Sequence, residues 1–105
     1  NMKRDFTYID DIISGIEFAI EKNYKCEVFN LGNNKSEKLM DMISLIEEEL
    51  GKKATINFMP MQLGDVVESF ADIEYTEKKL GFYPKISIKN GIPMFINWFK
   101  DFYTK

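Results

Sequence analysis

Four segments of this 105-residue chain carry apolar residues at the three- and four-residue spacing of an amphipathic helix. Short runs of β-favouring residues lie between these segments. Helices are predicted from Asp10 or Asp11 to Asn23, from Ser36 to Leu50, from Asp72 to Leu80 and from about residue 90 to 103, and strands over 4–9, 27–31 and 54–59. This mixture, without repeats or linkers, predicts one small α+β domain over residues 1–105 in which helices are mixed with short strands.

Capping residues mark the boundaries of the predicted helices. The predicted N-caps are Asp10 or Asp11 and Ser36, and the predicted helix ends are Asn23, Gly51 and Gly81. Pro93 falls within the last helical pattern, and a helix tolerates proline only in its first turn. Of the two candidate starts of that helix, Ser87 and Asn90, we therefore favour Asn90.

Composition and charge exclude several classes of function. The net charge is −3 and no lysine stripe interleaved with aromatic residues is present, so the chain is not expected to bind nucleic acid. No apolar run approaches the roughly 20 residues of a membrane span, so no membrane partner is expected. Histidine is absent and Cys26 is the single cysteine, which excludes an internal disulfide and a metal cluster built on His or Cys. A lone thiol fits a reducing, cytoplasmic compartment.

No motif in the sequence performs catalysis or binds a cofactor by itself. The six glycines stand singly, so there is neither a dinucleotide-binding fingerprint nor a P-loop. Tyr75 and Lys79 have the Tyr-x-x-x-Lys spacing of a dehydrogenase acid/base pair. They lie on a short predicted helix with no cofactor fold before it, and we interpret the spacing as coincidence. We predict no catalytic, cofactor-binding or metal-binding residue in this chain.

The first candidate binding segment is the connection over residues 59–72, between the third predicted strand and the third predicted helix. It carries polar residues that no core requires, namely Gln62, Asp65, Glu68 and Ser69, beside a Gly64-Asp65 turn. Binding groups concentrate on such loops when a rigid scaffold holds them. The alternative interpretation is an ordinary connection whose aspartates cap backbone amides.

Several segments of the sequence resemble those of nucleotide-sugar epimerases of the extended short-chain dehydrogenase/reductase superfamily. The matching segments are, in order, Arg4-Asp5-Phe6-Thr7-Tyr8-Ile9-Asp10-Asp11, Phe29-Asn30-Leu31-Gly32-Asn33, Pro60-Met61-Gln62-Leu63-Gly64-Asp65-Val66, Ala71-Asp72, Gly81-Phe82-Tyr83-Pro84 and the helix from Phe95 to Tyr103. Their ordered succession covers nearly the whole chain. The sequence most resembles UDP-glucuronate 4-epimerases.

The resemblance implies a division of labour between two domains. Such enzymes have an N-terminal Rossmann domain, which binds NAD and carries a catalytic Tyr-x-x-x-Lys pair, and a smaller C-terminal domain, which binds the UDP-sugar. Residues 1–105 would then form most of the smaller domain, without the Rossmann domain, and NAD would belong to the parent enzyme rather than to this piece. The related dehydratases and decarboxylases share this layout, so the resemblance leaves the reaction open.

The resemblance also implies roles for four substrate-binding residues. The arginine matching Arg4 contacts the diphosphate and the aspartate matching Asp65 holds the ribose hydroxyls, which suits a guanidinium and a carboxylate. Gln62 stands where galactose-type epimerases have an arginine and is typical of the glucuronate branch. Ser69 replaces a common threonine and keeps the hydroxyl. The alternative for Arg4 is a surface ion pair with Asp5, Asp10 or Asp11.

A second class of function remains open, namely a free-standing, non-catalytic interaction module from a truncated gene. A Gly-rich βαβ segment in frame before Asn1 would favour the epimerase, and a start codon near Met2 would favour the module. On the epimerase hypothesis, separation from the Rossmann half leaves apolar faces uncovered, and the chain is expected to self-associate. The two expected faces are Ile9, Ile13 and Ile20 on the first helix and Trp98, Phe99, Phe102 and Tyr103 on the last.

Overall fold

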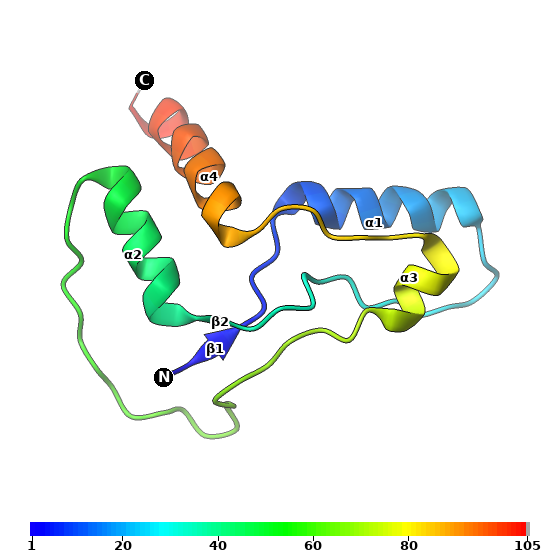
Figure 1. Cartoon of the computed structure of the whole chain (residues 1–105), viewed down its shortest axis with the longest axis horizontal. Helices are drawn as coiled ribbons and strands as arrows, with labels where there is room; N and C mark the ends of the chain where they lie inside the picture. Colours follow the sequence, from blue (N-terminus) through cyan, green and yellow to red (C-terminus); the bar gives the residue numbers. More distant parts are fainter. Residues whose placement is uncertain (105) are drawn as a thin grey trace.

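The computed structural model of the chain describes residues 1–104 and consists of four helices and one small sheet (Figure 1). The elements are β1 (Lys3–Arg4), α1 (Ile9–Lys22), β2 (Glu37–Lys38), α2 (Leu39–Leu50), α3 (Glu74–Leu80) and α4 (Ile88–Tyr103). The predicted α+β class, with helices and short strands and no Rossmann domain, is confirmed.

The helices pack as two pairs, α1 with α3 and α2 with α4, which lie at opposite ends of a flat molecule (Figure 1). Under α1 and α3, the side chains of Ile73, Leu80 and Phe82 form the most buried cluster. In α4, Ile92 and Ile96 are buried. Each pair therefore has its own small core, and extended segments connect the two.

Strand β1 lies between two partners. On one side it pairs antiparallel with β2, with Lys3 opposite Lys38 and Arg4 opposite Glu37. On the other side, Lys3 forms a parallel bridge with Glu68, which lies in the long segment between α2 and α3. Because β1 sits in the middle, the short stretch around Lys3 and Arg4 brings together parts of the chain that are far apart in sequence.

The predicted strands are mostly wrong. The first predicted strand, 4–9, overlaps β1 only at Arg4, and the segments 27–31 and 54–59 form no strand, whereas the unpredicted β2 does form. A strand requires a neighbour that satisfies its backbone hydrogen bonds, and β-favouring side chains alone do not supply one. Val28 is 85% exposed and Phe58 83% exposed, and within residues 1–104 no strand pairs with either segment.

Helix ends are predicted better than helix starts. Asn23, Gly51 and Gly81 end α1, α2 and α3 in the left-handed conformation, as expected. By contrast, α2 begins after Lys38 rather than at Ser36, whose buried hydroxyl has no hydrogen-bond partner within residues 1–104. The pairing of β2 with β1 occupies the residues that a Ser36 cap would have made helical.

The last two helices also begin differently from the prediction. The third helix starts at Glu74, and the Asp72 side chain accepts a hydrogen bond from the Glu74 amide at 3.1 Å. Helix α4 starts after Ser87, and the favoured start at Asn90 is wrong. The amides of Asn90 and Gly91 already bond to the Ser87 carbonyl, so the first turn closes there and Pro93 lies beyond it.

Neither Asp10 nor Asp11 caps α1, which begins after Tyr8 without a side-chain cap. The carboxylate of Asp11 is instead directed at the stretch between α3 and α4. It accepts hydrogen bonds from the amides of Lys85 (3.1 Å) and Ile86 (3.0 Å), and Asp11 is only 4% exposed. This buried carboxylate therefore attaches the stretch before α4 to the start of α1.

We expect Asp11→Ala to lower the free energy of unfolding by about 2–4 kcal/mol, because it leaves two backbone amides without their charged acceptor. The neighbouring variant Asp10→Ala, at an exposed position, is the control and is expected to change it by at most about 0.5 kcal/mol. Urea titrations followed by circular dichroism measure both. Equal unfolding midpoints for the two variants would contradict the assigned role of Asp11.

Candidate functional site

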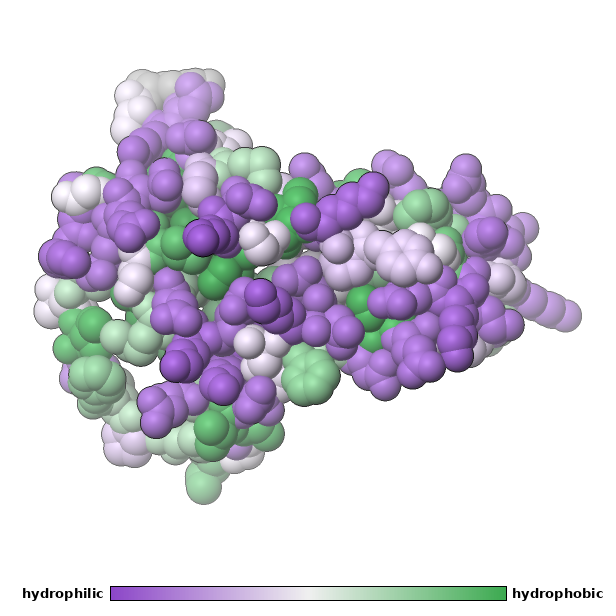
Figure 2. Space-filling model, in the orientation of Figure 1, coloured by the Kyte–Doolittle hydropathy of each residue, from purple (hydrophilic) through white to green (hydrophobic). Residues whose placement is uncertain are grey.

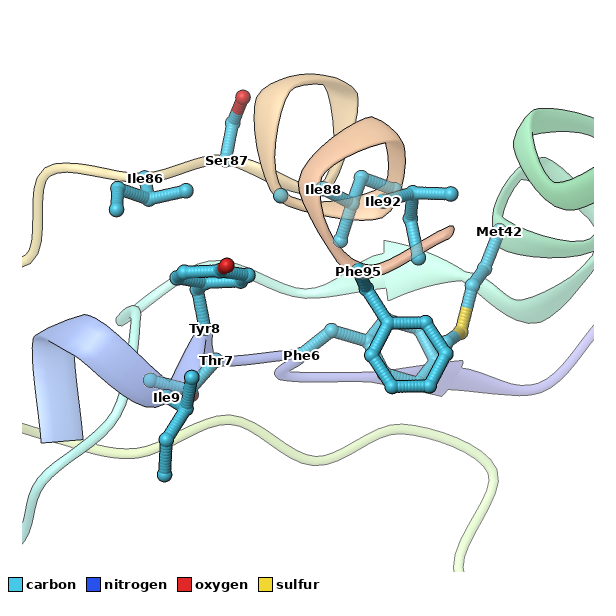
Figure 3. Close-up of a pocket in the computed structure, with 11 residues that line it drawn as sticks. Phe6, Thr7, Tyr8, Ile9, Met42, Ile86, Ser87, Ile88, Ile92 and Phe95 are labelled. Atoms are coloured by element: carbon cyan, nitrogen blue, oxygen red, sulfur yellow. The ribbon is translucent and has the colours of Figure 1, made fainter. Parts of the chain in front are cut away.

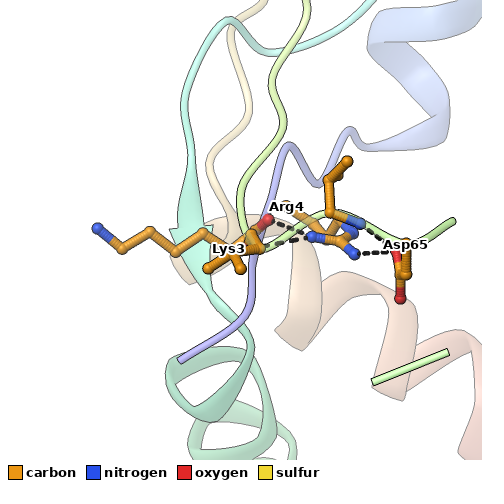
Figure 4. A network of polar contacts seen from close by, with 5 residues as sticks. Lys3, Arg4 and Asp65 are labelled. Atoms are coloured by element: carbon orange, nitrogen blue, oxygen red, sulfur yellow. Dashed lines mark hydrogen bonds and ion pairs between the residues drawn. The ribbon is translucent and has the colours of Figure 1, made fainter. Parts of the chain in front are cut away.

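The structure brings two of the four predicted site residues, Arg4 and Asp65, into direct contact (Figure 4). Arg4 Nη2 donates to Asp65 Oδ1 at 2.7 Å, and Arg4 Nη1 donates to the Lys3 carbonyl at 2.8 Å and to the Val67 carbonyl at 3.4 Å. The side chains of Arg4 and Asp65 are 27% and 38% exposed. A positive and a negative group thus stand side by side where a ligand has access to both.

The backbone holds this pair in place. The Lys3 amide donates to the Val67 carbonyl at 2.8 Å, and the Ser69 amide donates to the Lys3 carbonyl at 3.3 Å. Two residues N-terminal to this ladder, the Asp65 carboxylate also accepts a bond from the Val66 amide at 2.9 Å. The stretch 65–69 therefore runs beside β1 in a fixed register, which places Asp65 next to Arg4.

Gln62 and Ser69 lie on the same segment but contribute differently. The Gln62 carbonyl accepts a hydrogen bond from the Asp65 amide at 3.1 Å, which closes the turn at Gly64, where φ is +84°. Ser69 contributes its backbone amide to β1. Both residues are exposed, and their side chains make no hydrogen bond within the described chain. Their predicted contacts with substrate stay predictions.

Arg4 does form an ion pair, but not with any of the three aspartates considered from the sequence. Asp5 and Asp11 direct their carboxylates at backbone amides, and Asp10 is exposed. The partner, Asp65, is 61 residues away in the sequence. The family resemblance implies roles for both residues at different parts of one ligand, but no local sequence pattern indicates that they touch.

The segment that carries Asp65 is largely uncovered. Every residue from 51 to 70 is exposed, and several are apolar. The most exposed of these are Leu63, Phe58 and Met59, at 105%, 83% and 76%. Figure 2 shows hydrophobic side chains along the left and lower margin of the molecule, where this segment runs in Figure 1. The segment therefore has one ordered edge, against β1, and one open face.

The Tyr75 and Lys79 pair has a geometry unlike that of an acid/base pair. Tyr75 donates its hydroxyl to Glu27 at 2.8 Å, and its ring stacks on Phe29. The hydrogen bond to Glu27, then burial, then the negative charge of Glu27 raise the pKa of Tyr75 above its usual value. A tyrosine that acts as a base needs the opposite shift. The contacts support the interpretation of the Tyr-x-x-x-Lys spacing as coincidence.

Residues 1–104 contain neither a glycine-rich turn at a helix start nor a cluster of metal-ligating side chains. The four helices begin after Tyr8, Lys38, Ile73 and Ser87, and none of these starts is a glycine-rich turn that would seat a pyrophosphate. Within residues 1–104, no three His, Cys, Asp or Glu side chains gather as metal ligands. No helix in this part of the chain has the length and apolar character to cross a membrane.

An apolar pocket of about 320 Å³ lies apart from the Arg4 and Asp65 pair (Figure 3). Its lining comes from the connection between β1 and α1, from α2 and from the start of α4, and includes Phe6, Tyr8, Met42, Ile86, Ile92 and Phe95. The lining offers almost no polar group, so the pocket lacks the few placed hydrogen-bonding groups that fix a small polar ligand.

No protein-family model matches the sequence. Among curated proteins, the chain is 54% identical over 101 residues to an uncharacterized protein of Methanocaldococcus jannaschii, covering 96% of this chain and 31% of that protein. It is 38% identical over 99 residues to the UDP-glucuronate 4-epimerase of Thermodesulfobacterium geofontis, covering 93% of this chain and 30% of that enzyme. The chain thus spans about a third of the length of these relatives.

Solved structures give the same result. The UDP-glucuronic acid 4-epimerase of Bacillus cereus, in complex with UDP-glucuronic acid and NAD, superposes with a TM-score of 0.82 at 35% identity. The match covers 97% of this chain and 33% of that enzyme. Over nearly its whole length, the chain is therefore a homologue of the C-terminal part of UDP-glucuronate 4-epimerases and related NAD-dependent UDP-sugar epimerases, and the resemblance found in the sequence is confirmed.

Proposed function

We propose that this chain is the UDP-sugar-binding part of an NAD-dependent nucleotide-sugar epimerase, with UDP-glucuronate as the favoured substrate. The observation that carries the proposal is the Arg4 and Asp65 pair, held at β1 and partly exposed to solvent. Arg4 would bind the diphosphate and Asp65 the ribose hydroxyls. The chain would perform no chemistry alone, since the groups that bind NAD and transfer hydride would belong to the rest of the enzyme.

The chemistry of the pair supports this assignment. A guanidinium has five N–H donors, and the Arg4 contacts within residues 1–104 use only Nη1 and Nη2. The Asp65 contacts use only Oδ1, so Oδ2 is left to accept from a hydroxyl. The ion pair therefore fixes both side chains and leaves donors for a phosphate and an acceptor for a diol.

The shape of the molecule supports a large partner, which we propose to be the N-terminal Rossmann half. The surface area is 8177 Å², whereas a compact 12.3 kDa domain exposes about 6,100 Å². The radius of gyration is 16.3 Å, against about 13 Å for a compact domain of this length. The extra exposed surface area is larger than the roughly 800 Å² that each partner buries in a standard interface.

This excess also bears on the alternative functions. A free-standing module would have to keep its apolar surface small, yet the face of α1 is uncovered, with Ile9 and Ile20 at 58% and 73% exposed. We therefore favour a part of a larger enzyme. The similarity to UDP-glucuronate 4-epimerases supports an epimerase over a related dehydratase or decarboxylase. We place the protein in the cytoplasm.

In the full-length protein, Arg4→Ala and Asp65→Ala are each expected to weaken UDP-sugar binding about ten- to a hundredfold, because each removes a charge-assisted contact of about 1.5–3 kcal/mol. The NAD content is expected to be unchanged. Isothermal titration with UDP-glucuronate measures the affinity, and Glu48→Ala, at an exposed acid on α2, is the control. Wild-type affinity in both site variants would refute the assignment.

The 105-residue chain by itself is expected neither to bind NAD nor to convert UDP-sugars. No helix start within residues 1–104 provides a glycine-rich phosphate cradle, and Tyr75 is hydrogen-bonded to Glu27 rather than placed as a base. Calorimetry with NAD and a coupled epimerase assay test the two statements. Stoichiometric NAD binding to the isolated chain would overturn the proposed division of labour.

The isolated chain is expected to self-associate, most simply as a symmetric dimer, through its uncovered apolar faces. The aromatic residues expected on the second face are exposed on α4: Trp98, Phe99, Phe102 and Tyr103 at 51%, 39%, 57% and 63%. Size exclusion with light scattering at micromolar concentration measures the mass. A clean monomer that also fails to bind a hydrophobic dye would favour the free-standing module.

A further inference from the structure

The carboxylate of Asp5 joins three parts of the chain. Its Oδ1 accepts a hydrogen bond from the Asn33 amide at 3.0 Å. Its Oδ2 accepts from the amides of Asn34 and Ala71, each at 3.0 Å. Asp5 follows Arg4 directly, and Ala71 follows the stretch that carries Asp65. One side chain therefore connects β1, the loop before β2 and the segment of the candidate site.

The loop on one side of Asp5 is shaped to hold a carboxylate. Asn33 and Asn34 present successive backbone amides to it, and Asn34 adopts the left-handed conformation with φ at 55°. Successive amides in such a turn form an anion-binding concavity. A Cβ at Gly32 would lie 2.6 Å from that of Ala71 and 3.0 Å from Asp5 Oδ2. Only glycine at this position therefore lets the loop approach Asp5 and Ala71 this closely.

On the other side, Asp5 extends the ladder that holds the site. Along β1, the Lys3 amide and carbonyl bond to Val67 and Ser69. The next amide at the same two-residue interval, that of Ala71, bonds to the side chain of Asp5. The Asp5 side chain thus continues the hydrogen-bond register beyond β1. It holds residue 71, at the end of the segment that begins with Asp65.

We propose that Asp5 is a positioning residue for the nucleotide site, which holds the 65–71 segment in register so that Asp65 stands beside Arg4. Asp5 would act through its hydrogen bonds to backbone amides and not through direct contact with the nucleotide. This inference rests on the proposed function of the pair. Asp5 would then contribute to nucleotide affinity separately from its contribution to folding.

Asp5→Asn in the full-length protein tests the proposal. An amide has one oxygen for two acceptor positions, and its NH2 group would face a backbone N–H that also donates. We expect the affinity for UDP, measured by calorimetry, to fall about tenfold, and KM for the UDP-sugar to rise more than kcat falls. Ala71→Pro removes the amide that donates to Asp5 and also fixes φ at residue 71, and the same loss of affinity is expected there.

Asp11→Asn is the matched control. Asp11 also accepts hydrogen bonds from backbone amides of a distant segment, but it holds the stretch before α4 and not the 65–71 segment. It is expected to lower the melting temperature without changing UDP affinity. Equal losses of affinity in both asparagine variants would reduce Asp5 to a stabilising residue and overturn the proposal. Unchanged affinity in Asp5→Asn and Ala71→Pro, with losses in Arg4→Ala and Asp65→Ala, would overturn it and leave the proposed function standing.

Discussion

Two carboxylates that accept backbone amides hold this fold together. Asp5 accepts hydrogen bonds from the amides of Asn33, Asn34 and Ala71, and Asp11 accepts them from the amides of Lys85 and Ile86. Both lie on the short stretch from β1 to the start of α1, so segments separated by up to 75 residues meet on one strand and one helical turn. Several charge-assisted hydrogen bonds to one carboxylate offset the cost of burying its charge, and they fix its geometry well.

The same organisation leaves one face of the molecule uncovered. The contacts that order residues 65–71 are all on one edge, and the other face of residues 51–70 is open. Polar backbone groups and apolar side chains left in this way are normally covered by a neighbour. A large interface with the rest of an enzyme would cover that face, and would give the unpaired segments 27–31 and 54–59 the partners that strands need.

Sequence reasoning succeeded where the information is local. Helical periodicity and the left-handed ends at Asn23, Gly51 and Gly81 depend on neighbouring residues, and the structure confirms them. It failed for Asp11, taken as a helix cap, because the amides that Asp11 binds lie about 75 residues away. The candidate pair was named through a family resemblance, and its contact depends on a register between distant segments that no local pattern encodes.

The central claim is that β1 and the 65–71 segment beside it form the nucleotide site. Hydrogen exchange of the full-length protein, followed by mass spectrometry with and without UDP, tests it most directly, because amide protection reports local ordering. The account predicts slower exchange in peptides that cover residues 65–71 when UDP is present, and little change in α3. Protection confined to α3, or to the lining of the apolar pocket, would contradict it.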